Sequence, residues 1–267
     1  MTGKTKRRLF RIAKLIVLLY IAVGVLAYVF QEKLLFHPAP LPPEHRFAFD
    51  QPYEEINLAM PGGNLNIIRF AHAGTKKGLV VFFHGNKNNV EHYKKYAPLF
   101  TSRGYELWMP DYPGFGKSTG ERSEAILYEQ ALMVYELAAE GGDSITIYGK
   151  SLGTGIAAYV ASRRACTQLV LETPYYSIAE LAKSYFRIYP FMPAPRYTFP
   201  THSYLAGVKA PVTIFHGTED EVIPYSQAAR LAKKYPRIRF FRIENGQHNN
   251  LFDFASYQAG MDSLLIN

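Results

Sequence analysis

The sequence predicts an α/β protein built on a mostly parallel sheet with helices on both faces. The chain has 267 residues, 48% of them apolar, which is enough for one sizeable core. Short apolar runs such as GLVVFFHG (78–85) recur along it, and stretches of helical period separate most of them. Strands that are buried on both faces have such continuous apolar runs, so the alternation indicates a parallel sheet.

The individual strands can be expected from these runs. EINLAM (55–60) and NLNIIRFAH (64–72) flank Pro61-Gly62-Gly63 and predict a hairpin at the start of the sheet. Six more strands are expected within 78–85, 105–112, 144–149, 168–174, 211–217 and 239–246. Residues 52–267 should therefore form one folded body.

One connection within that body, between Pro174 and Pro211, is dense in Tyr, Phe and Pro. We expect residues 175–208 to form a short lid, with Tyr175 and Tyr176 as substrate contacts, because ligands of parallel sheets bind at the carboxyl ends of strands. A helix with a packed loop is the alternative.

The N-terminal segment predicts a membrane anchor. Residues 15–30 carry no charge, and a helix that starts at Ile12 would be about 28 Å long, close to the hydrocarbon thickness. Six basic residues precede it, so residues 1–36 should be a cytoplasmic tail and a single-pass helix, with the body extracytoplasmic. A cleaved signal peptide is the alternative. The absence of any N-x-[ST] sequon favours a bacterial periplasm.

The next segment, residues 37–51, begins with HPAPLPPEHR, which contains four prolines. It lacks hydrophobic periodicity. We expect it to be a stiff spacer that holds the body away from the bilayer.

Charge and composition exclude several function classes. The formal charge is +8, but the N-terminal 33 residues contribute most of it, and the body is nearly neutral. A nucleic-acid partner is therefore not expected. The single cysteine, Cys166, cannot form an internal disulfide, and the histidines lack the HxH and HExxH spacings. We expect no metal and no cofactor, and a monomer.

The stretch YGKSLGTG (148–155) admits three interpretations. A phosphate-binding P-loop fails because Ser144 stands where its first glycine is required. A dinucleotide fingerprint, Gly153-x-Gly155-x-x-Ala158, has an acid at Glu172 near the ribose position, and would make the chain a tethered oxidoreductase.

The fingerprint is disfavoured because Gly149 already makes the turn from the strand. Gly155 and Ala158 would then only let the helix pack closely on the sheet. Glu172 would be an ordinary strand-end carboxylate, and Lys150 would have no role.

The third interpretation is a nucleophile elbow, in which Gly149-x-Ser151-x-Gly153 holds a serine on a sharp turn between strand and helix. A serine hydroxyl attacks a carbonyl poorly without a base, and the base needs an orienting acid. His248, after the last strand, is the candidate base. The acid is one of Glu219, Asp220 and Glu221. The backbone N–H groups of Asn86 and Leu152 should form the oxyanion hole, and His84 should be structural.

With these motifs in place the chain resembles the α/β-hydrolase superfamily over roughly residues 52–265. It looks most like a membrane-anchored acyl-hydrolase branch with palmitoyl-protein-thioesterase-like and lysophospholipase or serine-aminopeptidase-like members. The resemblance rests on HGN (84–86), DYPGFGKS (111–118), GKSLG (149–153), HGTEDEVIP (216–224) and GQHN (246–249).

Matching HGTEDEVIP to the family's HGxxDxxVP selects Asp220 as the acid, and Asp111 is structural in the family's loop. The resemblance implies a serine hydrolase that cleaves an ester or thioester of a small or lipid-like acyl substrate. A serine aminopeptidase-type amide hydrolase and a non-catalytic binding protein of the same fold remain alternatives.

Overall fold

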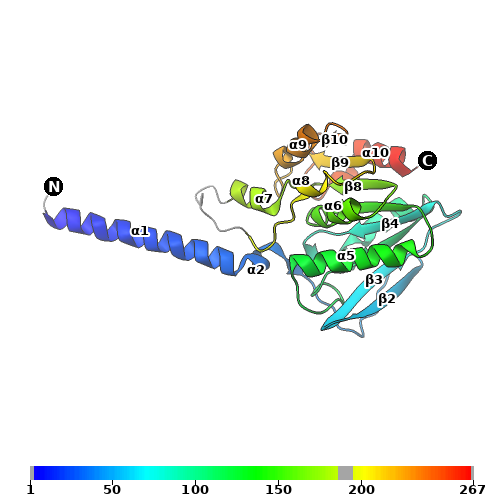
Figure 1. The fold of residues 1–267 in the computed structure, drawn as a ribbon, viewed down its shortest axis with the longest axis horizontal. Coiled ribbons are helices and arrows are strands. Elements are labelled where there is room, and N and C mark those ends of the chain that lie inside the picture. The colour runs from blue at the N-terminus through cyan, green and yellow to red at the C-terminus, as the bar shows by residue number, and fades with distance from the viewer. Residues whose placement is uncertain (1–2, 186–194, 266–267) are drawn as a thin grey trace.

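An eight-stranded sheet runs through the protein in the computed structural model, which describes residues 3–185 and 195–265 (Figure 1). The strand order is β10-β9-β8-β7-β4-β6-β3-β2, and in this sheet β3 alone runs opposite to the other strands. The strands of this sheet are β2 (Tyr53–Met60), β3 (Gly63–Phe70), β4 (Gly78–Phe83), β6 (Tyr105–Pro110), β7 (Ile145–Lys150), β8 (Gln168–Glu172), β9 (Val212–Gly217) and β10 (Arg239–Ile243).

Helices cover both faces of the sheet (Figure 1). Side chains alternate across each strand, so Val81 and Phe83 of β4 belong to the core layer that includes α5, α6 and α9, whereas Val80 and Phe82 belong to the layer that includes α4 and α10. The helices are α1 (Gly3–Val29), α2 (Gln31–Leu35), α3 (Val90–Tyr93), α4 (Ala97–Thr101), α5 (Glu124–Ala139), α6 (Gly153–Arg163), α7 (Ile178–Tyr185), α8 (Thr201–Tyr204), α9 (Tyr225–Lys234) and α10 (Ala255–Leu265).

The predicted strands are confirmed, and so is the hairpin, which turns at Gly62 with a φ of 74°. Several predicted strands extended too far at their carboxyl ends: β6 stops at Pro110 and β10 at Ile243. The residues beyond those points leave the sheet as loops. These loops carry the side chains of the candidate site.

The N-terminal helix α1 projects from the body (Figure 1) and buries none of its side chains. Its length and apolar composition are sufficient to cross a membrane. An apolar helix that is largely exposed is suited to a nonpolar surrounding or to a role as a targeting segment. The chain therefore has one N-terminal segment suited to be a membrane anchor or a signal.

Part of the segment expected to be a stiff spacer, residues 37–51, packs on the body. Its first residues form a two-residue strand, β1 (His37–Pro38), that pairs in parallel with β5 (Lys87–Asn88). Leu41 also donates its N–H to the carbonyl of Gly116 at 2.7 Å. We call residues 36–41 the strap. Apolar side chains stabilise this packing, because Phe36 and Phe47 are buried against the body.

The predicted lid, 175–208, contains α7 and α8. Residues 186–194 of that prediction lie outside the described residues. Helix α7 follows β8 and lies beside α2 and the end of α1, whereas α8 packs on α6 (Figure 1).

Candidate active site

Ser151 lies on the sharp turn between β7 and α6. Its φ is 51°, a left-handed value that costs energy in a residue with a side chain. Glycines make the turn possible: a Cβ on Gly149 would lie 2.6 Å from the carbonyl oxygen of Gly153, and one on Gly153 would lie 2.0 Å from that of Phe83. The local sequence thus folds as the elbow interpretation predicts.

Loops at the carboxyl ends of β9 and β10 bring two further predicted residues to this turn. His248 Nε2 lies 3.0 Å from Ser151 Oγ. On the other side of the ring, His248 Nδ1 lies 2.8 Å from Asp220 Oδ2. The three side chains are 97 and 28 residues apart in sequence and are all buried. In this geometry a carboxylate can fix the tautomer that leaves Nε2 free to accept the serine proton.

The surroundings of Asp220 favour its charged form. Burial raises the pKa of its carboxyl, but hydrogen bonds from His216 and His248 and from the backbone N–H of Ile223 outweigh burial, so the pKa is well below its usual range. The N–H groups of Val222 and Ile223 reach Oδ1 at 2.9 and 2.7 Å.

Sequence reasoning missed His216, whose Nε2 lies 3.3 Å from Asp220 Oδ2. The sequence did contain a signal for this contact, since His216 is the first residue of the HGTED motif and Asp220 is the last.

The two predicted oxyanion donors lie on loops beside the nucleophile. No hydrogen bond within the described chain uses the backbone N–H of Asn86 or Leu152. The loop that carries Asn86 is close to Ser151, because a Cβ on Gly85 would lie 3.6 Å from the Cβ of Ser151. The other polar groups of Asn86 have partners. Its carbonyl accepts the backbone N–H of His37 at 2.8 Å, and its side-chain amide donates to the carbonyl of Leu35 at 2.5 Å.

His84 and Asp111 are fully buried and contact each other, with Nε2 3.1 Å from Oδ1. Asp111 also accepts the N–H of Val90 at 3.0 Å, which fixes the start of α3. Burial raises the pKa of Asp111, and the contact with His84 only partly opposes this. Both residues therefore support the loop after β4, as the sequence predicted, and neither reaches the Ser151 hydroxyl.

The expectation for Lys150 and Glu172 requires a correction, because we predicted no special role for either residue. They are register partners on β7 and β8, are almost fully buried, and form an ion pair. Lys150 Nζ also donates to the carbonyl of His248 at 3.2 Å. The pair therefore joins the elbow strand to the loop of the candidate base.

Three tyrosine hydroxyls complete the surroundings of Glu172: Tyr96 at 2.8 Å, Tyr257 at 3.0 Å, and Tyr148. Burial raises the pKa of Glu172, but the Lys150 charge and these hydrogen bonds outweigh it, so the pKa is lowered. The signal in the sequence was a pair of opposite charges at the ends of two otherwise apolar strands.

Tyr175 and Tyr176, the predicted substrate contacts, both have contacts within the protein. Tyr175 is 1% exposed and donates its hydroxyl to the carbonyl of Leu152 at 3.0 Å. Gly155 leaves room for it, since a Cβ there would lie 2.3 Å from the Tyr175 oxygen. Gly155 therefore accommodates Tyr175, rather than close packing on the sheet as we expected. Tyr176 stacks on His202 at 4.2 Å between ring centroids.

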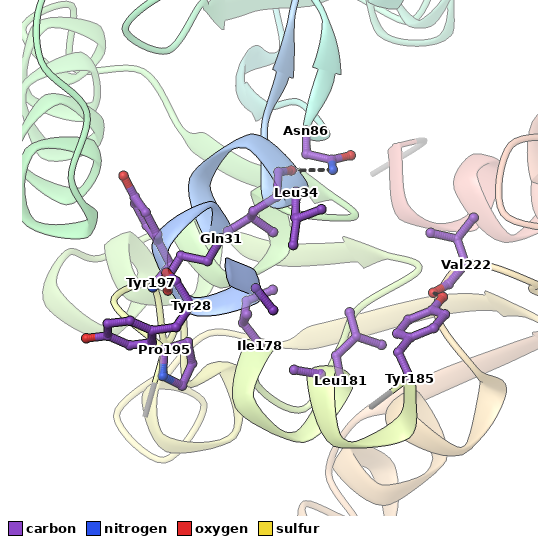
Figure 2. Close-up of a pocket in the computed structure, with 13 residues that line it drawn as sticks. Tyr28, Gln31, Leu34, Asn86, Ile178, Leu181, Tyr185, Pro195, Tyr197 and Val222 are labelled. Atoms are coloured by element: carbon purple, nitrogen blue, oxygen red, sulfur yellow. Dashed lines mark hydrogen bonds between the residues drawn. The ribbon is translucent and has the colours of Figure 1, made fainter. Parts of the chain in front are cut away.

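A cavity of about 250 Å³ opens beside the candidate site (Figure 2). Neither Tyr175 nor Tyr176 lines it. Its walls come from the end of α1, from α2 and α7, and from Asn86, Tyr197 and Val222. Most of the lining is apolar or aromatic, and none of the lining residues that the structure describes is charged.

Comparison with known proteins shows which family this chain belongs to. A family model described as "Serine aminopeptidase, S33" matches residues 74–204. The alpha/beta hydrolase domain-containing protein 17C of Xenopus tropicalis is 31% identical over 189 residues, which is 67% of this chain and 58% of that protein. The chain belongs to the α/β-hydrolase superfamily.

Solved structures of this superfamily agree with the fold. A Pyrococcus furiosus esterase aligns with a TM-score of 0.67 at 16% identity, over 86% of this chain and 97% of the esterase. A monoacylglycerol lipase of Paleococcus ferrophilus aligns with a TM-score of 0.58 at 19% identity, over 76% of this chain and 98% of the lipase. At such identities the likeness shows an α/β-hydrolase fold alone. The chain spans 58% of the length of the first curated relative, the Xenopus protein.

Proposed function

We propose that the protein is a membrane-anchored serine hydrolase that cleaves an ester or thioester through an acyl-enzyme on Ser151. The observation that carries the proposal is the continuous hydrogen-bonded series from Ser151 Oγ through His248 to Asp220. A serine on a strained elbow, next to a buried histidine and a carboxylate held in its charged form, is suited to nucleophilic catalysis.

In the first half of the reaction, Ser151 Oγ attacks the acyl carbonyl carbon while His248 Nε2 takes the hydroxyl proton. The negative charge that develops on the carbonyl oxygen is stabilised by the N–H groups of Asn86 and Leu152. Collapse of the tetrahedral intermediate breaks the bond to the alcohol or thiol, which leaves with the proton from His248. Water then attacks the acyl-enzyme by the same route and releases the carboxylic acid.

An ester or thioester fits this site better than an aminoacyl amide. An aminopeptidase has to recognise the positive α-amino group of its substrate, which calls for a carboxylate in the binding site. None of the thirteen described residues that line the cavity is acidic. Two of the structural neighbours are named as an esterase and a monoacylglycerol lipase, and both names denote the hydrolysis of esters.

A fluorophosphonate probe tests the nucleophile. We expect the folded full-length protein to be labelled, and Ser151→Ala to abolish the labelling while the melting temperature stays close to that of the wild type. Labelling that persists in Ser151→Ala, or a folded wild type that is not labelled, would contradict the proposal.

Hydrolysis of p-nitrophenyl butyrate tests the acid. Asp220→Asn should lower kcat/KM by about 10³–10⁴-fold, because an amide N–H facing His248 Nδ1 stabilises the wrong tautomer. Glu219→Gln, which alters the exposed neighbouring carboxylate, is the matched control and should retain activity. Equal losses in the two variants would exclude Asp220 as the orienting acid.

A further inference from the structure

The cavity in Figure 2 is built partly from the N-terminal anchor. Ala27 and Tyr28, in the last turn of α1, form one part of its wall, and Leu34 and Leu35 of α2 form the next. Ile178 and Leu181 of α7 face them from the body. A segment suited to a membrane and a segment of the folded body thus enclose one space.

Polar contacts fix the end of the anchor in this position. Gln31 donates its side-chain N–H to the carbonyl of Tyr28 at 2.7 Å, and its side-chain oxygen accepts the N–H of Arg196 at 2.6 Å. Arg196 also lies over the Tyr28 ring, 5.6 Å from its centroid. The wall contributed by α1 and α2 is therefore attached to the body by specific contacts.

The polar atoms around the cavity are largely used by these and similar contacts. The Asn86 side chain donates to Leu35, Tyr185 donates to the carbonyl of Val222, and Tyr197 donates to the carbonyl of Arg122. The remaining lining is dominated by hydrocarbon. Such a space favours an apolar ligand over water or a charged group.

The two ends of the cavity differ. At one end lie Asn86, whose N–H is a proposed oxyanion donor, and Val222, whose N–H binds Asp220 Oδ1 at 2.9 Å. At the other end lies the last turn of α1, at the edge of the apolar stretch. A linear ligand could therefore have its carbonyl at Ser151 and its tail at the surface of the bilayer.

We propose that this cavity binds the acyl chain of a membrane-resident ester or thioester, and that the end of the anchor helix is part of the acyl-binding wall. This inference rests on the proposed function. An engineered apolar cavity of about 150 Å³ holds benzene, with its six carbons. A volume of about 250 Å³ therefore accommodates about ten acyl carbons.

The test measures kcat/KM for p-nitrophenyl butyrate and decanoate with the full-length protein in phosphatidylcholine nanodiscs. Each methylene buried in the cavity should raise kcat/KM by up to about fourfold, and partition of the ester into the bilayer removes part of that gain. We expect decanoate to exceed butyrate by at least about tenfold in the wild type.

Ala27→Trp fills the cavity from the anchor side and should lower the decanoate-to-butyrate ratio about tenfold or more. Val25→Trp is the matched control, because Val25 lies on the same helix, is 54% exposed and does not line the cavity. It should keep the wild-type ratio. Leu181→Trp fills the cavity from α7 and should act like Ala27→Trp, so the test stands even if one variant does not fold.

The outcomes separate this inference from the proposed function. If butyrate is hydrolysed but the ratio is near one in the wild type, or is the same in all four proteins, the cavity does not bind the acyl chain. If neither ester is hydrolysed and the fluorophosphonate does not label Ser151, the proposed function itself fails.

Discussion

Beneath the elbow, a buried ion pair holds two strands and a loop together. Lys150 Nζ contacts both Glu172 and the carbonyl of His248, and Ser151 donates its N–H to the carbonyl of Glu172 at 2.9 Å. Burying two charges is costly unless each is paired and hydrogen-bonded. The tyrosine hydroxyls supply the additional bonds to Glu172. At the scale of residues, the positions of Ser151 and His248 therefore depend on side chains that do not take part in proton transfer.

Lys150→Met should destabilise the protein in a pH-dependent way. In the wild type the pKa of Glu172 is lowered, so its stabilising contribution is present above about pH 4 and is lost as pH falls through the folded-state pKa. Without the ammonium, burial raises this pKa, so the variant instead loses stability as pH rises. Removing one partner costs about 3–5 kcal/mol at neutral pH, which corresponds to a melting temperature lower by roughly 10 °C.

Thermal unfolding in detergent micelles at pH 5 and pH 8 measures this difference. Lys183→Met, which removes an ammonium that is 71% exposed, is the control and should change little at either pH. The melting temperatures of Lys150→Met and the wild type should differ more at pH 8 than at pH 5. An equal difference at the two pH values would contradict a charged buried pair.

At the scale of elements, the strap determines where α1 and α2 meet the body. Its β1 pairs with β5, directly after the predicted oxyanion residue Asn86. Phe36 packs its ring against Tyr197 at 4.9 Å and Phe115 at 6.4 Å between centroids. A free spacer would leave α1 and α2 without a defined place. The strap instead keeps them beside α7, where they close one side of the cavity.

Phe36→Ala should therefore cost about 3 kcal/mol, because it leaves a cavity among aromatic rings. The adjacent variant His37→Ala removes an exposed side chain from the same segment and should change stability by less than about 0.5 kcal/mol. Melting temperatures of both full-length variants in detergent micelles give the comparison. Two equally small effects would mean that the segment is a spacer after all.

At the scale of the whole molecule, the N-terminal charge predicts the side of the membrane. Basic residues precede the apolar part of α1, and the positive-inside rule then places the body outside the cytoplasm. A C-terminal alkaline phosphatase fusion should be active, because that enzyme needs disulfides that form outside the cytoplasm. A C-terminal green fluorescent protein fusion should be dark. For a chain without residues 1–30, we expect an inactive phosphatase fusion and a fluorescent green fluorescent protein fusion. Fluorescence from the full-length fusion would contradict the predicted topology.

The strands, the elbow and the candidates Ser151 and His248 could be predicted from local patterns, whereas Asp220 was chosen over its acidic neighbours only by the resemblance to the hydrolase family. Continuous apolar runs and glycine positions are local patterns, and the spacing of motifs at strand ends follows from parallel topology. The roles of Lys150, Glu172, Tyr175 and Gly155 depended on contacts between segments far apart in the chain, which no local pattern records.

The strap and the cavity were also decided only by the tertiary structure. Four prolines within ten residues indicate a stiff segment, but whether that segment packs depends on the apolar surface available on the body for Phe36 and Phe47. The acyl-binding wall proposed here joins α1, α2, α7 and the loop after β4. Its apolar character arises because apolar side chains from these separate parts of the chain line it, and because several of its polar groups are hydrogen-bonded within the protein.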